Sequence, residues 1–274
     1  MTFVVQKCLL ILFQIRTNTM TNLLQDKGVR LFLFLTAFFM TNAIIAQFIG
    51  VKIFAFEDTV GMAPLNWNLF GHSGSLMLSA GVLPWPIVFV TTDIINEYYG
   101  KRGVKLLSYT GVFMIFFAFL IVFAVIQLEP ADFWIASYQT QGVPDAQAAF
   151  ATIFGQGAWM IVGSIIAFLL GQIIDAFVFD KLRRWTKDKM VWLRATGSTI
   201  ISQFIDSFVV LYIAFVLGPA EWPISQFLAV GTVNYSYKFL VALSLTPIIY
   251  LAHSLIDRYL GKERAEMMRQ EAIA

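Results

Sequence analysis

Six apolar runs of membrane length constrain this chain more than any other feature of its sequence. A helix crosses the hydrocarbon core of a bilayer with about 20 residues. Runs of that length occupy Leu31–Phe56, Leu76–Asn96, Val104–Gln127, Gly155–Phe179, Gly197–Leu217 and Phe227–His253. The composition agrees, because 58% of the residues are hydrophobic and only 13% are charged. We therefore expect an all-α, polytopic membrane protein built as a bundle of six transmembrane helices.

The lysines and arginines predict the orientation of these helices. Seventeen of the 19 lie before the first run, at the turn from the second run to the third, between the fourth and fifth, or after the sixth, and the exceptions are Lys52 and Lys238. Because cytoplasmic loops are enriched in basic residues, we expect both termini to be cytoplasmic. The chain then divides into a cytoplasmic N-terminal segment (1–30), a transmembrane domain (31–253) and a cytoplasmic C-terminal tail (254–274).

The apolar segment Phe3–Ile15 is too short to span a membrane, and Gln6 and Lys7 interrupt it. It lacks the small-residue cleavage site of a signal peptide. Two interpretations stay open, a true start of translation at Met20 or an interfacial helix.

The sequence carries few of the groups that catalysis and metal binding require. Cys8 is the single cysteine, and there are two histidines, His72 and His253. The motifs of serine hydrolases, zinc proteases and phosphate-binding loops are missing from the sequence. We therefore expect no catalytic residue, no metal and no cofactor, and a protein that is not an enzyme.

The second run ends in an unusual concentration of polar groups. Pro84 and Pro86 lie inside it and are expected to kink or break its helix, because proline lacks a backbone donor. Asp93 and Glu97 follow, and an acid at membrane depth is a functional candidate by default. The alternative is a polar cap at the cytoplasmic end of the helix, anchored by Lys101 and its neighbour.

Further polar side chains lie on single faces of other runs. The candidates for contact with a substrate are Asn42, Gln47, Asp93, Glu97, Gln203, Asp206, Asn234, Tyr235 and Lys238. Together they suit a cavity near the middle of the membrane that holds a small, flat, hydrogen-bonding ligand. A carboxylate can accept two parallel N–H bonds from such a ligand, an amide can match a neighbouring carbonyl, and an aromatic ring can stack.

Structural roles compete with these assignments. Asp206 and Lys238 can form an ion pair between the last two helices. Asn42 and Gln47 can join helices by hydrogen bonds. Asp175 can pair with Arg183 or Arg184. The small residues Gly163, Ala167 and Gly171 can serve packing within the chain or a homodimer.

One stretch resembles a known family. Pro86 and the run Thr92–Asp93–Ile94–Ile95–Asn96–Glu97–Tyr98–Tyr99–Gly100–Lys101 resemble the signature of the queuosine precursor transporter family, also called the vitamin uptake transporter family. Thr41–Asn42, Ser202–Gln203 with Asp206, and Tyr235 with Lys238 are similar too. The likeness covers roughly residues 30–255.

The resemblance implies a protein of the bacterial inner membrane that imports 7-deazaguanine precursors of queuosine, such as preQ0 and preQ1, for tRNA modification. It implies a fold similar to the substrate-binding components of energy-coupling-factor transporters. The expected partners are the small-molecule substrate and the lipid bilayer, with no direct nucleic acid contact. Asp206 or Asp93 would then bind the guanine-like edge, Gln203 and Asn234 would complete the hydrogen bonds, and Tyr235 would stack.

Other functions stay open at this point. The protein could be a substrate-binding component that requires a separate ATPase module, or a carrier for another vitamin-like molecule. An intramembrane enzyme and a structural subunit without a ligand are the alternatives from other classes. The spread of polar residues over five of the six runs argues against a purely structural subunit.

Overall fold

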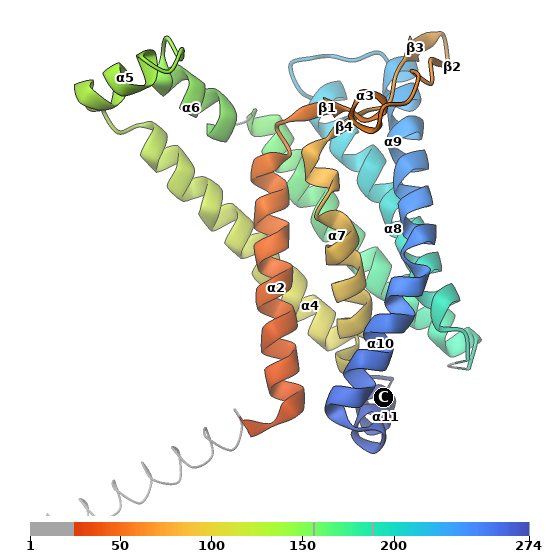
Figure 1. The fold of residues 1–274 in the computed structure, drawn as a ribbon. Helices are drawn as coiled ribbons and strands as arrows, with labels where there is room; N and C mark the ends of the chain where they lie inside the picture. Colours follow the sequence, from red (N-terminus) through yellow and green to blue (C-terminus); the bar gives the residue numbers. More distant parts are fainter. Residues whose placement is uncertain (1–24, 156, 188, 274) are drawn as a thin grey trace, which may run out of the picture.

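The computed structural model describes residues 25–155, 157–187 and 189–273, most of them helical (Figure 1). The segment Phe3–Ile15 lies outside the described residues. The long helices are α2 (Lys27–Ile49), α4 (Trp85–Ile126), α7 (Ala158–Trp185), α8 (Val191–Leu211), α9 (Ile224–Ser244) and α10 (Thr246–Leu260). In the described chain, four helical segments are long and apolar enough to cross a membrane, or five if α9 and α10 count as one bent span. The prediction of a helical, multi-pass membrane protein is confirmed.

Short elements connect the long helices. At one end of the bundle, β1 (Ile53–Ala55) pairs antiparallel with β4 (Met77–Ser79), and β2 (Trp67–Leu69) pairs antiparallel with β3 (His72–Gly74). Helices α3 (Phe56–Val60), α5 (Asp132–Gln139) and α6 (Ala146–Gly155) lie at this same end (Figure 1). A 3-10 turn, η1 (Ala80–Val82), precedes α4, and a π-helical turn, η2 (Tyr212–Val216), extends α8.

Helix α4 consists of two arms that meet at Gly100. This glycine has φ 65° and ψ −171°, outside the helical region, and the chain reverses its direction there (Figure 1). Glycine adopts a positive φ readily because it has no Cβ atom. The arms, residues 85–99 and 101–126, contain most of the second and third apolar runs of the sequence.

A side chain at position 100 would collide with the end of the chain. A Cβ atom built on Gly100 would lie 2.6 Å from the backbone oxygen of Ala272. We expect Gly100→Ala to lower the free energy of unfolding by about 2–4 kcal/mol, because backbone strain and a steric clash add. The apparent melting temperature of the purified protein in detergent measures this loss.

Gly61→Ala is the matched control for this substitution. Gly61 also has a positive φ, of 71°, but a Cβ atom there would have no neighbour within 4 Å. Gly61→Ala should therefore lower the free energy of unfolding only through backbone strain. Equal losses at Gly61 and Gly100 would mean that the Ala272 carbonyl moves aside freely.

The two prolines of the second run begin its helix and do not break it. Pro84 is the N-cap of α4, and Pro86 lies in the first turn. A proline is tolerated there because the first amide groups of a helix have no intrahelical partner to lose. The prediction of a kinked helix over Leu76–Asn96 is therefore wrong, since residues 77–82 form β4 and η1.

The first run also ends earlier than its hydropathy suggests. Helix α2 stops at Ile49, and the following apolar residues Ile53–Ala55 are used in the pairing of β1 with β4. Lys52 therefore lies beyond the helix and is exposed, contrary to its prediction inside a span.

The last run is bent. Helices α9 and α10 meet at an angle of 43°. Pro247 lies in the first turn of α10, where it removes a backbone donor and prevents α9 from continuing straight. The single straight span predicted over Phe227–His253 is therefore corrected to a bent pair.

The small residues of α7 pack against α8. A Cβ atom on Gly163 would lie 3.2 Å from the backbone oxygen of Val210, and one on Gly171 would lie 3.7 Å from Cβ of Asp206. Ala167, between them, is buried. Small residues at this spacing let two helices approach closely. The stripe thus serves packing within the chain.

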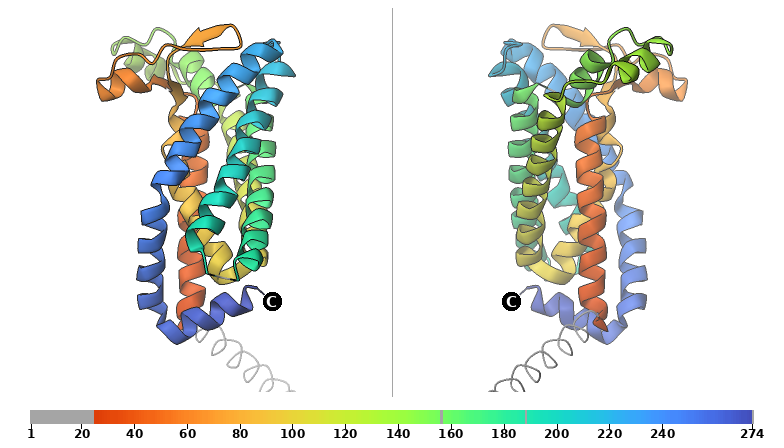
Figure 2. Two further views of the ribbon diagram at one scale, coloured as in Figure 1. Left: turned by 90° about the vertical axis from the view of Figure 1, so that its right-hand side faces the viewer. Right: turned by 90° about the vertical axis from the view of Figure 1, so that its left-hand side faces the viewer.

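Helix α11 (Lys262–Glu271) lies across the end of the bundle at which α4 turns (Figure 2). Its Arg269 donates to Oδ1 of Asp257 at 2.8 Å and to the hydroxyl of Tyr98 at 3.2 Å. Burial alone would lower the pKa of Arg269. Its hydrogen bonds to Glu266 and Asp257 help to outweigh burial and raise the pKa above its usual value, so the guanidinium stays charged. The segment expected as a C-terminal tail is therefore the end of α10 followed by a packed helix.

Candidate functional site

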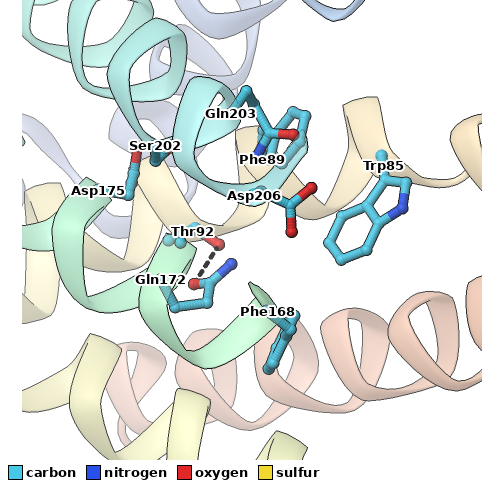
Figure 3. A pocket seen from close by; sticks show the side chains of 10 residues that line it. Trp85, Phe89, Thr92, Phe168, Gln172, Asp175, Ser202, Gln203 and Asp206 are labelled. Atoms are coloured by element: carbon cyan, nitrogen blue, oxygen red, sulfur yellow. Dashed lines mark hydrogen bonds between the residues drawn. The ribbon is translucent and has the colours of Figure 1, made fainter. Parts of the chain in front are cut away.

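A polar and aromatic pocket lies between α4, α7 and α8 (Figure 3). Its lining residues are Trp85, Phe89, Thr92, Phe168, Gly171, Gln172, Asp175, Ser202, Gln203 and Asp206. Gly171 presents no side chain, so Asp206 on the facing helix comes close to the backbone of α7. Pockets that bind small molecules typically combine apolar walls with a few placed polar groups, as this one does.

One wall of the pocket is aromatic. The ring centroids of Trp85 and Phe89 are 5.7 Å apart with nearly parallel planes, and Trp85 lies 6.0 Å from Phe168. Because α4 begins directly after its N-cap Pro84, the Trp85 ring lies at the pocket. Such rings offer a flat face on which a planar ligand can stack.

The opposite side of the pocket carries hydrogen-bonding groups. The Thr92 hydroxyl donates to Oε1 of Gln172 at 3.3 Å, and the Ser202 hydroxyl donates to Oδ1 of Asp175 at 3.2 Å. Oε1 of Gln203 is buried and has no hydrogen-bond partner among the described residues. An unpaired buried acceptor is costly, so this oxygen suits a ligand that donates a hydrogen bond.

Asp206 is paired with a lysine of the neighbouring helix. Nζ of Lys238 lies 2.6 Å from Oδ2 of Asp206, and both side chains are largely buried. The ion pair considered from the sequence is thus present between α8 and α9. It does not remove Asp206 from the pocket, because the carboxylate lies between Trp85 and Gln203 in Figure 3.

The pocket is nearly closed in this conformation. The free space between its side chains is about 10 Å³, enough for about one water molecule. A bicyclic base does not fit without movement of the lining side chains or of the helices that carry them.

Glu97 lies outside the pocket and is bound by arginines. Arg194 donates to Oε1 of Glu97 at 2.6 Å through Nη2 and to Oε2 at 3.1 Å through Nε, and Nη2 of Arg183 lies 3.7 Å from Oε1. All three side chains are at most 3% exposed. A two-pronged guanidinium–carboxylate contact is among the stronger polar interactions in proteins. A substrate contact for Glu97 stays a prediction.

Asp93 follows the pocket residue Thr92 on α4 but does not line the pocket. It is 2% exposed, and its Oδ1 has no hydrogen-bond partner among the described residues. Its charge environment includes Asp175 on α7 and Arg194 on α8.

The other predicted site residues lie away from the pocket. Gln47 accepts a hydrogen bond from Ser164 at 3.0 Å and so joins α2 to α7, and Asn42 donates to a backbone carbonyl of its own helix. On α9, Asn234 and Tyr235 are half-buried, with the Tyr235 ring edge-on to Phe204. Of the nine predicted residues, Gln203 and Asp206 line the pocket.

Several lining residues were missed by the sequence-based site. Gln172 had a usable signal, since it is a lone amide in an apolar run three residues before Asp175. Asp175 had been considered as a partner for Arg183 or Arg184, but Arg184 binds Asp180 at 3.1 Å and Asp175 faces Ser202. Trp85 had a signal in its position between Pro84 and Pro86, whereas Phe89 and Phe168 had none among the 27 phenylalanines.

A second pocket, of about 540 Å³, lies at the strand end of the bundle. Its buried acid is Glu57, whose Oε1 accepts from the backbone N–H groups of Leu76 at 2.6 Å and Leu65 at 3.4 Å. Burial raises the pKa of Glu57, but these donors lower it below its usual value. The lining contains no aromatic side chain. A planar ligand would have no stacking face there.

These features define a multi-pass membrane protein with a polar and aromatic pocket inside its helical bundle. The chain belongs to the queuosine precursor transporter family, since residues 79–252 match the family described as "Putative vitamin uptake transporter". That family consists of transporters and not of enzymes.

Named relatives agree with this family. The chain is 30% identical over 190 residues to a Bacillus subtilis protein named "Probable queuosine precursor transporter", covering 69% of this chain and 76% of that one. It is 26% identical over 194 residues to the Escherichia coli "Queuosine precursor transporter", covering 69% and 79%. A Haemophilus influenzae relative is 25% identical over 166 residues, covering 60% and 63%. No solved structure matches the chain significantly.

Proposed function

We propose that this protein imports 7-deazaguanine precursors of queuosine, such as preQ0 and preQ1, across the bacterial inner membrane for tRNA modification. The observation that carries the proposal is the pocket between α4, α7 and α8, which pairs an aromatic wall with acids and amides. The names of the relatives support the choice of substrate.

The pocket suggests how a deazaguanine would be held. The base would stack on Trp85, or between Trp85 and Phe168. Its N1–H and 2-amino groups would donate to Asp206, and Oε1 of Gln203 would take a further donor. This assignment keeps Asp206 and Gln203 from the sequence-based site and leaves out Asn234 and Tyr235 of α9, which do not line the pocket.

The arrangement of helices supports six spans. Counting the two arms of α4 separately, with α9–α10 as one bent span, gives six crossings with α2, α7 and α8. We infer that the end bearing α11 and the Gly100 turn is cytoplasmic, because the basic residues gather at this end. A fold similar to the energy-coupling-factor components follows from the same resemblance.

Transport requires the pocket to open. With about 10 Å³ of free space, the described conformation is a closed one. Movement of α8 against α7 would enlarge the pocket, and the small residues Gly163 and Gly171 allow such sliding because they present no side chains at the contact.

Purified protein in liposomes tests the function directly. We expect time-dependent uptake of labelled preQ0 or preQ1 by the protein alone, and none of biotin. Uptake without a partner would exclude the alternative in which a separate ATPase module is required. Absence of uptake and of exchange by folded protein would overturn the proposed function.

Gln203 offers a sharp test of the site. Since its Oε1 has no hydrogen-bond partner among the described residues, Gln203→Leu should not lower the apparent melting temperature. It should weaken deazaguanine binding by about tenfold, the loss of one hydrogen bond. Ser207→Ala is the matched control, because the Ser207 hydroxyl is also buried without a partner in the described chain but does not line the pocket. Unchanged binding in Gln203→Leu would remove Gln203 from the site.

A further inference from the structure

Two buried carboxyl groups of the bundle have no basic partner. In the described chain the buried acids are Glu57, Asp93, Glu97, Asp175, Asp180 and Asp206. Glu97 binds two arginines, Asp180 binds Lys101 and Arg184, and Asp206 binds Lys238. Glu57 lies outside the spanning helices and is held by backbone N–H groups. Asp93 and Asp175 form no ion pair with any described residue.

Asp93 and Asp175 lie near one another on facing helices. The hydrogen bond from Thr92 to Gln172 joins α4 to α7 one residue before Asp93 and three residues before Asp175. Both side chains are buried beside this contact, with Asp93 2% and Asp175 6% exposed. Asp175 accepts a hydrogen bond from Ser202 at 3.2 Å, whereas Oδ1 of Asp93 accepts none from the described residues. Two adjacent carboxylates in such a buried place repel each other and lose hydration, so both cannot remain ionised without compensation.

A count of the charges around Asp93 and Asp175 also indicates that the two acids cannot both stay ionised. Asp93, Glu97 and Asp175 supply three carboxyl groups against the two guanidiniums of Arg183 and Arg194, so this cluster is one proton short of neutrality.

No other element packed against these acids in the described chain supplies a positive charge for them. Asp257 of α10 and Arg269 of α11 pair with each other at 2.8 Å, and His253 of α10 is bound to the Tyr98 hydroxyl. The titratable residues of α2, Lys27 and Arg30, are exposed at its end.

We propose that Asp93 and Asp175 together carry one transported proton, which couples substrate uptake to the proton gradient. The inference rests on the proposed function. Asp175 lines the pocket and Asp93 adjoins its Thr92, so an opening that admits the substrate also admits the proton. One proton binds to the pair from the outer side and is released on the inner side, and no bond of the substrate is made or broken.

Coupling to the proton gradient can be separated from substrate binding in proteoliposomes. The membrane potential is held at zero, so that only the pH gradient can drive uptake. The probe is preQ0, which is uncharged. If one proton enters with each substrate molecule, a lumen about one pH unit more alkaline than the outside should drive about tenfold accumulation of preQ0. A tenfold ratio of protons and a tenfold ratio of substrate each correspond to about 1.4 kcal/mol, so the two balance. A pH-sensitive dye in the lumen should report acidification that depends on added preQ0.

Asp93→Asn, at an acid that does not line the pocket, should lose this response selectively. This variant is expected to exchange labelled for unlabelled preQ0, but the gradient should produce no accumulation and no acidification of the lumen. Asp175→Asn should also lose gradient-driven accumulation. Asp180→Asn is the matched control, because it is the same change on α7 at an acid that has basic partners. Asp175→Glu, which keeps the carboxyl group, should retain coupling.

The outcomes distinguish the two proposals. Wild-type protein that exchanges preQ0 but ignores the gradient would overturn proton coupling and leave the proposed function standing. Wild-type protein that neither exchanges nor accumulates preQ0 would overturn the proposed function itself. Gradient-driven accumulation that survives in both asparagine variants would remove Asp93 and Asp175 from the coupling. If an asparagine variant fails to fold, the wild-type stoichiometry and Asp175→Glu still decide the matter.

Discussion

Glu97→Gln is expected to be the most destabilising conservative substitution in the bundle. The carboxylate balances two guanidiniums, and Glu97, Arg183 and Arg194 are each at most 3% exposed. Removing one partner of a buried ion pair costs about 3–5 kcal/mol, because the remaining charge is left uncompensated. We expect a lower yield of folded protein and a clearly lower apparent melting temperature in detergent.

Glu129→Gln controls for the substitution itself, because Glu129 is exposed and forms no ion pair among the described residues. Surface changes of this kind usually alter stability by less than about 0.5 kcal/mol. The experiment also decides the sequence-based assignment of Glu97. If Glu97 contacts substrate and is not needed for folding, the variant will melt like wild-type and lose only deazaguanine binding.

Asp206→Asn is expected to lose both stability and substrate binding, for separable reasons. The substitution leaves Lys238 without its partner at 2.6 Å. Because these side chains are 13% and 14% exposed, the cost should be smaller than at Glu97, about 1–3 kcal/mol. Binding should fall further, because the carboxylate is the proposed acceptor of the guanine-like edge.

The double variant Asp206→Asn with Lys238→Met separates the two effects. Removing both charges should restore most of the stability, since a buried pair can often be replaced by apolar groups of similar size. It should not restore binding, measured as the rise in apparent melting temperature with preQ1. Recovery of binding in the double variant would mean that Asp206 acts on Lys238 and not on the substrate.

Hydropathy predicted the helical bundle because a spanning helix needs a continuous apolar stretch. It could not predict where helices end, since the same apolar residues serve strands as well. Ile53–Ala55 and residues 77–79 are apolar enough to extend a span, yet they pair as β1 and β4. That pairing depends on two segments more than twenty residues apart, which a local pattern does not reveal.

The site was predictable in part, where a polar side chain stands in an apolar run. Gln203 and Asp206 were found in this way and line the pocket. The roles of Asp93 and Glu97 could not be separated from the sequence, because both are acids on the same helix one turn apart. Only the fold brings Arg183 and Arg194 to Glu97 and leaves Asp93 without an ion pair among the described residues.

The close contact between Ala272 and Gly100 has a practical consequence for protein engineering. Residues 272 and 273 lie against the α4 turn and Arg184, which donates to the Ile273 carbonyl at 3.5 Å. A fluorescent reporter or affinity tag fused shortly behind this contact is expected to strain it, and with it the hydrogen bond from Arg269 of α11 to Tyr98. A spacer of about ten flexible residues would span up to about 33 Å and relieve that tension. Fusions with and without the spacer therefore measure how firmly α11 is held against the turn of α4.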